Sequence, residues 1–448
     1  MKKILMIFLL SLTIYSCEKE FTDHNKITED AAYHTAEAYP GILLGVTKSF
    51  ATNTLWRIVH GPGLTGHELG NMLTYETEIQ LAEGGPALTG ANSSVSDLWY
   101  LLHRNREIAE KVLFYIDDVD FVNPEEKAAY KAYAKFLKAM TTGYMAQYWE
   151  KVTLQNDPEN NAQFVDRFEG LQKSVDLLHE AVSDLDSQSG TEDIINNLVS
   201  YEFSIRDAIY AFIARYEIEL ENYQNAFDAA NMVDLTKKSV WSYDGGSIKN
   251  PIYRGILDPG ATLRVKPYDS LGLMGNKIPE LGDLRNDFYL DYTGEYSTTC
   301  TLPVDNPQGF WDTEVTPIPV YLPGEMILIK AEAKAREGSL TEAVSYINEI
   351  RTKTPSQDPF GVGASLGDWT GDATNSQEVL DEIFKNYAIE LFMEGQRWPI
   401  HRRFYPHYLD GVDFNTVLGC QLERANNFYP YPENERSNNP NCPPDPAY

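Results

Sequence analysis

The chain has 448 residues, of which 66 are acidic and 37 basic, and its formal net charge is −29 at pH 7. So acidic a chain repels phosphate backbones, and no basic stretch with interleaved aromatic residues occurs, which excludes nucleic acid as a partner. After the first 16 residues, no apolar stretch is long enough to span a bilayer as a helix. Three cysteines remain beyond that point, Cys300, Cys420 and Cys442; they allow at most one disulfide, leave three pairings open and match no zinc ligand set.

The N-terminal residues have the layout of a secretory signal. A basic start precedes an apolar run over residues 4–14, which is too short to span a bilayer, and small residues follow. The residues before Cys17 resemble the lipobox of bacterial lipoproteins, in which the cysteine thiol is acylated and becomes the new N-terminus. Ile14 and Ser16 fit that pattern, whereas Tyr15 is bulkier than the usual residue. The alternative is an ordinary cleaved signal followed by a chance cysteine.

We therefore expect residues 1–16 to be a lipoprotein signal peptide and Cys17 to be lipidated. Residues 17–27 are polar and charged, and are expected to form a tether. Membrane attachment then depends on the acyl chains, each buried methylene contributing about 0.8 kcal/mol. Residues 28–448 are expected to form a single domain.

Periodic apolar residues predict long helices in the first half of this domain. Apolar side chains recur with helical spacing over residues 98–112, and the alanine-rich stretch 128–149 follows. Residues 171–185 carry a third stripe, with a leucine or valine every three or four positions. Strand signals are few, so an all-α fold is predicted.

Two later segments resemble each other. Residues 214–233 and 331–350 align without gaps, so that Ala214 meets Ala331 and another pair of alanines falls in the second half of each segment. Each segment reads as two helices joined by a short turn, with small residues where the helices approach. This pattern is typical of a tetratricopeptide hairpin, although any antiparallel helix pair gives a similar pattern.

Three regions lack clear periodicity and are rich in glycine, proline, aspartate and aromatic residues. They span residues 57–97, 236–320 and 355–376. Long irregular segments in a compact protein usually carry function. We therefore expect a loop-rich second face that holds the site.

No catalytic or metal motif is intact. Residues 363–367 match G-x-S-x-G, but glycine-rich sequence surrounds them where the motif needs a strand and a helix. Residues 67–71 begin like a zinc-protease helix, yet Asn71 occupies the place of the second histidine. Residues 117–120 lack the glycine and glutamate of a calcium loop. Neither a P-loop nor a dinucleotide fingerprint occurs, so no catalytic residue, metal or cofactor is predicted. A structural calcium is left open.

The C-terminal part contains a helical stripe over residues 379–391, and the glycine after Glu394 is expected to end this helix. Arg397, Arg402 and Arg403 follow closely. We expect charge pairs between these arginines and Glu390 or Glu394.

This part of the chain is similar to the SusD/RagB-like lipoproteins of Bacteroidetes. The matching residues, in family order, are Glu390-Leu391, Glu394-Gly395, Arg397-Trp398, Arg402-Arg403, Pro430-Tyr431-Pro432, Glu435 and Asn439-Pro440-Asn441. Upstream, residues 323–333 and 347–351 match the family's helix pair, and the resemblance covers nearly all of the mature chain. Pro399, His401 and Tyr431 depart from the common residues. Each motif alone is weak, and the ordered set is specific.

The resemblance implies an all-helical body with tetratricopeptide units and a loop-rich second face. It implies a lid over a SusC-like TonB-dependent outer-membrane transporter, to which the protein delivers captured glycans or peptides, and no catalysis. It also implies a lipid-anchored protein on the outer membrane, exposed at the cell surface; the charged run of residues 18–20 looks like the export signal of such lipoproteins. The matched motifs define the fold and carry no binding residues to this chain.

Ligand-binding residues are therefore predicted from chemistry. Saccharides are bound by aromatic faces, with polar side chains bonding to the hydroxyl groups. Aromatic residues in the irregular regions are the best candidates, namely Tyr75, Trp241, Tyr243, Trp311 and Trp369. Two other functional classes stay open: a secreted hydrolase acting on polysaccharide, and a tetratricopeptide scaffold that binds only protein.

Overall fold

The computed structural model describes residues 29–200, 202–257, 261, 263–265, 271, 273, 275–297, 303–407 and 426–447. The predicted signal peptide, the tether with Cys17, and the cysteines Cys300 and Cys420 lie outside these residues, whereas Cys442 lies within them and is half-buried. Within the described ranges, no helix has the length and apolarity needed to cross a membrane.

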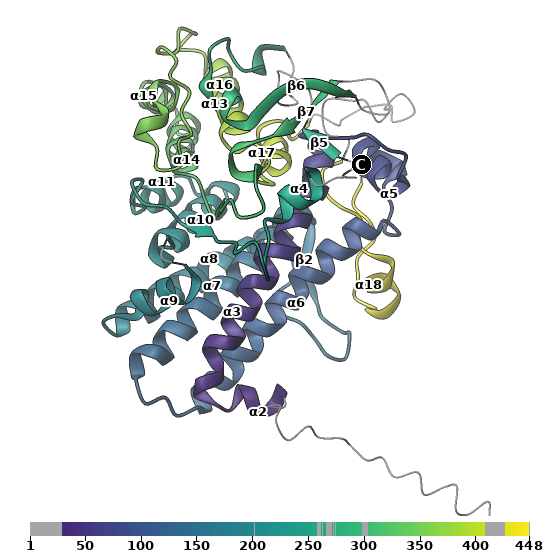
Figure 1. The fold of residues 1–448 in the computed structure, drawn as a ribbon, viewed down its shortest axis with the longest axis vertical. Helices are drawn as coiled ribbons and strands as arrows, with labels where there is room; N and C mark the ends of the chain where they lie inside the picture. Colours follow the sequence, from purple (N-terminus) through teal and green to yellow (C-terminus); the bar gives the residue numbers. More distant parts are fainter. Residues whose placement is uncertain are drawn as a thin grey trace, which may run out of the picture.

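Long helices form one half of the molecule, where α3, α6, α7 and α8 run side by side (Figure 1). These helices are α3 (Tyr39–Ser49), α6 (Ser93–Tyr115), α7 (Pro124–Tyr148) and α8 (Arg167–Ser187). The helices predicted over residues 98–112, 128–149 and 171–185 are thereby confirmed. Asn92 caps α6, since its side chain accepts hydrogen bonds from the amides of Ser94 and Val95. Gly143 lets α10 approach α7, because a Cβ there would lie 2.1 Å from the Tyr216 ring.

The two predicted hairpins are present. The first joins α10 (Ile205–Glu219) to α11 (Tyr223–Asn231), the second joins α14 (Pro323–Arg336) to α15 (Leu340–Thr352), and α11 packs on α14. The second turn needs Gly338, whose φ is +84°. Ala226 and Ala343 are fully buried where the helices meet. The fold class predicted from the sequence is confirmed, since the described chain is mostly helical.

The strands form small antiparallel sheets. The largest has the order β1-β5-β7-β6 and lies at the end of the molecule that also holds α5 (Figure 1). The strands are β1 (Leu69–Asn71), β2 (Lys151–Thr153), β3 (Phe164–Asp166), β4 (Val240–Trp241), β5 (Leu263–Val265), β6 (Leu290–Ser297), β7 (Pro303–Pro307) and β8 (Ile318–Pro319). The remaining α-helices are α2 (Glu29–Tyr33), α4 (Leu55–Thr65), α5 (Glu76–Glu83), α9 (Thr191–Val199), α12 (Pro251–Ile256), α13 (Leu284–Tyr289), α16 (Ser376–Glu390), α17 (Arg397–Phe404) and α18 (Glu433–Asn438).

The region 57–97 is not irregular, and that prediction is wrong. It contains most of α4, all of α5 and the start of α6. Its glycines serve close packing: a Cβ on Gly61 would lie 3.0 Å from the Tyr429 hydroxyl, and one on Gly63 would lie 3.1 Å from a methyl group of Leu69. By contrast, most of the expected irregular region 355–376 is a long loop, which spans residues 358–375 between a short 3-10 helix and α16.

Candidate ligand-binding site

Two of the five predicted site aromatics, Trp241 and Tyr243, lie in the hydrophobic core. Trp241 is 3% exposed, and its ring packs on Phe50 and Phe203, with centroid distances of 5.5 and 5.9 Å. The Tyr243 hydroxyl donates a 2.9 Å hydrogen bond to the Ala51 carbonyl. Their faces are covered by protein, so the expectation that these residues lie at the surface is wrong.

Trp311 is also in the core. It is 0% exposed, and its ring stacks on Tyr289 at 5.5 Å and meets the edge of Phe392 at 6.2 Å. The physical reason is shared by all three residues: at these positions the segment 236–320 packs into the core instead of lying on the surface. Absent periodicity does not distinguish such a buried connection from an exposed loop.

Tyr75 is exposed at the beginning of α5. Its backbone carbonyl accepts hydrogen bonds from the Glu78 and Ile79 amides at 3.1 and 3.0 Å, which fixes the main chain. The side chain is 55% exposed, and Leu73 beside it is 47% exposed. The aromatic ring of Tyr75 therefore faces solvent, while its main chain is fixed by hydrogen bonds to α5.

Trp369 lies half-buried in the connection between α15 and α16. Its amide donates a 2.8 Å hydrogen bond to the Asn348 side chain on α15. Its ring lies against Gly371, where a Cβ would come within 2.2 Å of the indole. Asp368 and Thr370 on either side are exposed. The combination of an indole with an exposed carboxylate and hydroxyl is suited to a saccharide.

Main-chain hydrogen bonds attach this Trp369 loop, residues 353–375, to its neighbours. The amides of Ser365 and Leu366 donate to the carbonyls of Lys353 and Arg351, at 3.0 and 2.8 Å. The Leu284 amide at the start of α13 donates to the Ala364 carbonyl at 3.1 Å. The loop is therefore held on both sides before it reaches Trp369.

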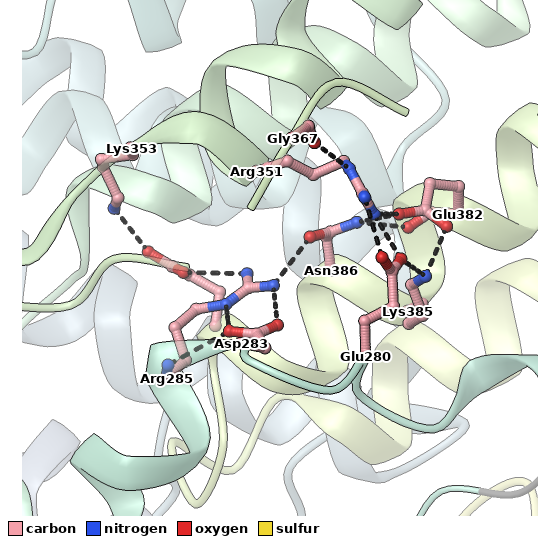
Figure 2. Close-up of polar contacts among 10 residues, drawn as sticks. Glu280, Asp283, Arg285, Arg351, Lys353, Gly367, Glu382, Lys385 and Asn386 are labelled. Carbon is pink, nitrogen blue, oxygen red and sulfur yellow. Dashed lines mark hydrogen bonds and ion pairs between the residues drawn. The ribbon is translucent and has the colours of Figure 1, made fainter. Parts of the chain in front are cut away.

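A charge cluster supports the loop from below (Figure 2). Arg351 on α15 donates from Nε to the Gly367 carbonyl at 3.1 Å and also bonds to Glu280 and Glu382. Lys385 on α16 contacts the same two carboxylates at 2.9 and 2.7 Å. The hydrogen bond from Arg351 is the largest cause that lowers the pKa of Glu280 to about 2. Two cations thus fix two carboxylates, and one of the cations holds the loop.

A second, deeper group adjoins it. Arg285 bonds to Asp283 at 2.7 Å and to Glu390 at 3.2 Å, and Lys353 bonds to Asp358 at 2.7 Å and to Glu390 at 2.8 Å. Burial alone would lower the pKa of Lys353, but the two carboxylates raise it above its ordinary value. We call these two groups together the paired network. It makes the base of the Trp369 loop rigid, and rigid support is what a preorganised site requires.

Within the described residues, Arg397 and Arg403 have partners other than the expected Glu390 and Glu394. Arg403 pairs with Glu332 at 2.8 Å, and Arg402 donates to main-chain carbonyls. Arg397 has Glu68 at 3.6 Å. The reason is geometric: α16 ends at Glu390, before the predicted glycine, and a turn follows before α17 begins in a new direction.

The predicted aromatics thus do not form one site. The structure leaves Trp369 and Tyr75 accessible, and they lie by α15 and α5, on opposite sides of the view in Figure 1. The sequence reasoning missed the paired network, because its members are spread over residues 280–390 and only the fold brings them together.

Comparisons with known proteins agree on one family. Residues 310–445 match the model of the SusD family. No curated protein sequence matches the chain. A SusD superfamily protein of Bacteroides vulgatus is 14% identical, with a TM-score of 0.66, and the match covers 93% of this chain and 100% of that one.

Two further solved structures give the same result. A SusD homolog of Bacteroides thetaiotaomicron is 13% identical, with a TM-score of 0.70 and coverage of 94% and 99% of the two chains. A SusD-like carbohydrate binding protein of Bacteroides fragilis is 14% identical, with a TM-score of 0.63 and coverage of 92% and 99%. The C-terminal segment thus matches the SusD family model, and the chain shares the fold of these SusD-like structures over more than 90% of its length.

Proposed function

We propose that this chain captures glycans at the cell surface and delivers them to a SusC-like TonB-dependent outer-membrane transporter, without catalysing a reaction. The family match over residues 310–445 supports this role, as does the likeness to a solved protein described as carbohydrate binding. The observation that carries the proposal is the Trp369 loop. It presents an indole with adjacent hydrogen-bonding groups on a rigid base.

The first test is binding of an oligosaccharide panel to wild type and to Trp369→Ala and Tyr75→Ala. Phe114→Ala and Tyr100→Ala are matched controls, because both remove exposed rings from α6. We expect Trp369→Ala to weaken binding of a captured glycan about 2- to 10-fold, as an aromatic contact of about 0.5–1.5 kcal/mol implies. Unchanged affinity in both Trp369→Ala and Tyr75→Ala, with loss in a control, would place the site elsewhere.

The second test concerns the anchor and the partner. Lipidation at Cys17 attaches the protein to the outer membrane, so a tagged, lipidated protein pulled down in detergent is expected to copurify with a TonB-dependent barrel. Cys17→Ala is the control, since the soluble variant loses the anchor but keeps the body. An intact, folded preparation without any barrel would contradict delivery to a transporter.

The alternatives have their own readouts. The hairpins α10–α11 and α14–α15 favour a protein-binding scaffold as second candidate, because stacked hairpins of this kind present peptide-binding surfaces. A peptide library in place of the oligosaccharides separates a peptide ligand from a glycan. Release of reducing ends from polysaccharide, abolished by one carboxylate substitution, would establish the hydrolase instead.

A further inference from the structure

Three lysines of the described residues are nine-tenths or more buried, and they differ in their partners. They are Lys330, Lys353 and Lys385. Lys353 and Lys385 each bond to two carboxylates of the paired network, and both are drawn in Figure 2. Lys330 makes no hydrogen bond or ion pair within the described part of the chain. The Lys330 side chain is mostly buried, but its ammonium nitrogen still reaches solvent, so this ammonium is accessible to an anionic ligand.

Aromatic rings hold Lys330 in position. It lies on α14, and its ammonium is 5.0 Å from the ring centroid of Tyr346 on α15. Lys334, one helical turn later, lies 4.4 Å from the ring centroid of Phe227 on α11. The two rings meet edge to face at 6.1 Å. Two ammonium groups on one face of α14 are thus oriented by cation–π contacts from the helices on both sides.

The neighbouring carboxylates do not neutralise Lys330. Glu349 is near enough to raise its pKa slightly, but burial has the larger effect and lowers that pKa. Lys334 has Glu337 at 3.3 Å and Glu342 at 3.9 Å, with side chains 30% and 64% exposed. Such exposed pairs contribute little free energy and exchange readily. One ammonium is therefore unpaired, and the other is weakly paired.

We propose that Lys330 and Lys334 bind the carboxylate of an acidic sugar, a uronic acid unit of a glycan, between α11 and α15. This inference rests on the proposed glycan-binding function and adds a second subsite, apart from the Trp369 loop. A carboxylate would give Lys330 the charge-assisted hydrogen bond that it lacks. Phe227 and Tyr346 supply apolar surface for the sugar ring, which a lone anion or a flexible acidic side chain does not require.

The experiment is calorimetric titration with trigalacturonate and with its methyl ester, which keeps the rings but has no charge. Wild type is expected to bind the acid about 10-fold more tightly than the ester, as expected for one charge-assisted hydrogen bond. Lys330→Met removes the ammonium and keeps the apolar chain, and it is expected to abolish that difference. Lys238→Met is the matched control, because Lys238 also lies over a ring, Phe360 at 5.8 Å, but its side chain is 38% exposed and lies near Glu202.

The outcomes separate the two proposals. If neutral oligosaccharides bind through Trp369 but Lys330→Met leaves the acid-to-ester ratio unchanged, the uronate subsite is wrong and glycan capture stands. If no glycan binds at all, the proposed function fails with it. Triglutamate that binds to wild type and is lost in Lys330→Met, without any binding of trigalacturonate, would overturn the sugar assignment in favour of an acidic peptide.

Discussion

The paired network and the Lys330 subsite both contain a mostly buried lysine, but the two lysines have different surroundings. In the network, Lys353 lies within 2.8 Å of two carboxylates, and the group closes on itself around Arg285. At the subsite, Lys330 is equally buried but faces aromatic rings. A buried charge with all its partners fixes structure, whereas a buried charge without them retains the capacity to bind a ligand.

The largest expected effect comes from breaking the paired network. Lys353→Met leaves Asp358 without its cation and leaves Glu390 with Arg285 alone, and removing one partner of a buried pair destabilises a protein by about 3–5 kcal/mol. Urea unfolding at pH 7 measures this free energy. Lys238→Met, on the surface, is expected to stay within about 0.5 kcal/mol of wild type. A loss below 1 kcal/mol for Lys353→Met would show that the network is dispensable.

The sequence alone predicted the parts of this comparison that depend on local pattern. Alanines at matched positions of the two hairpins, such as Ala226 and Ala343, indicated where helices meet, and both residues are buried there. The sequence also contained a signal for the subsite. Lys330 and Lys334 interrupt the apolar sequence of α14, a helix that is buried along nearly its whole length. A lysine within such a helix needs a partner or a function.

The rest depends on tertiary contacts that no local pattern encodes. Trp241 and Trp311 have loop-like neighbours in sequence, but both side chains pack into the core. Arg403 pairs with Glu332, 71 residues away, rather than with the nearby glutamates. Gly324 in α14 had no evident role until the fold placed the Glu390 carboxylate against it, where a Cβ would clash at 1.8 Å.

Glu394 is the acidic counterpart of Lys330, and it extends the comparison to carboxylates. Its Oε1 is buried without a hydrogen-bond partner within the described residues, and burial raises its pKa well above 4.5. The positive charge of Arg215 opposes this shift, whereas the negative charges of Glu325 and Glu68 increase it. The folded state thus binds a proton more tightly than the unfolded state, so stability is greatest at acid pH and falls as pH rises from 4.5 through the raised pKa.

We expect Glu394→Gln to remove this dependence and to stabilise the protein by about 1–2 kcal/mol at pH 8. Unfolding free energies measured from pH 5 to pH 8 test the prediction. Glu349→Gln, an exposed change on α15, is the control. A variant that is less stable than wild type at pH 8 would mean that the ionised carboxylate is favourable.

Glu280 tests the exposed edge of the paired network. Its pKa of about 2 means that its contribution is complete above pH 4.5 and is lost as pH falls toward 2. Because the side chain is 43% exposed, Glu280→Gln is expected to cost only about 1 kcal/mol at pH 7. Arg351 would keep Glu382, so the amides of Ser365 and Leu366 should exchange faster without global unfolding. If amide hydrogen exchange in the Trp369 loop is the same in Glu280→Gln as in wild type, the paired network does not hold this loop in place.

The smallest expected effect belongs to Lys330→Met without ligand, and its sign decides the comparison. If Lys330 serves ligand binding, it lowers the stability of the ligand-free protein. Lys330→Met should then raise the free energy of unfolding by about 0.5–1 kcal/mol at pH 7. Burial lowers the pKa of Lys330, so wild-type stability should rise as pH increases from that lowered pKa toward 10.5, and the variant should lack this rise. Thermal unfolding at pH 7 and pH 10 measures both. If Lys330→Met instead lost as much stability as Lys353→Met, Lys330 would be a structural charge like the others, because only a charge the fold depends on is costly to remove.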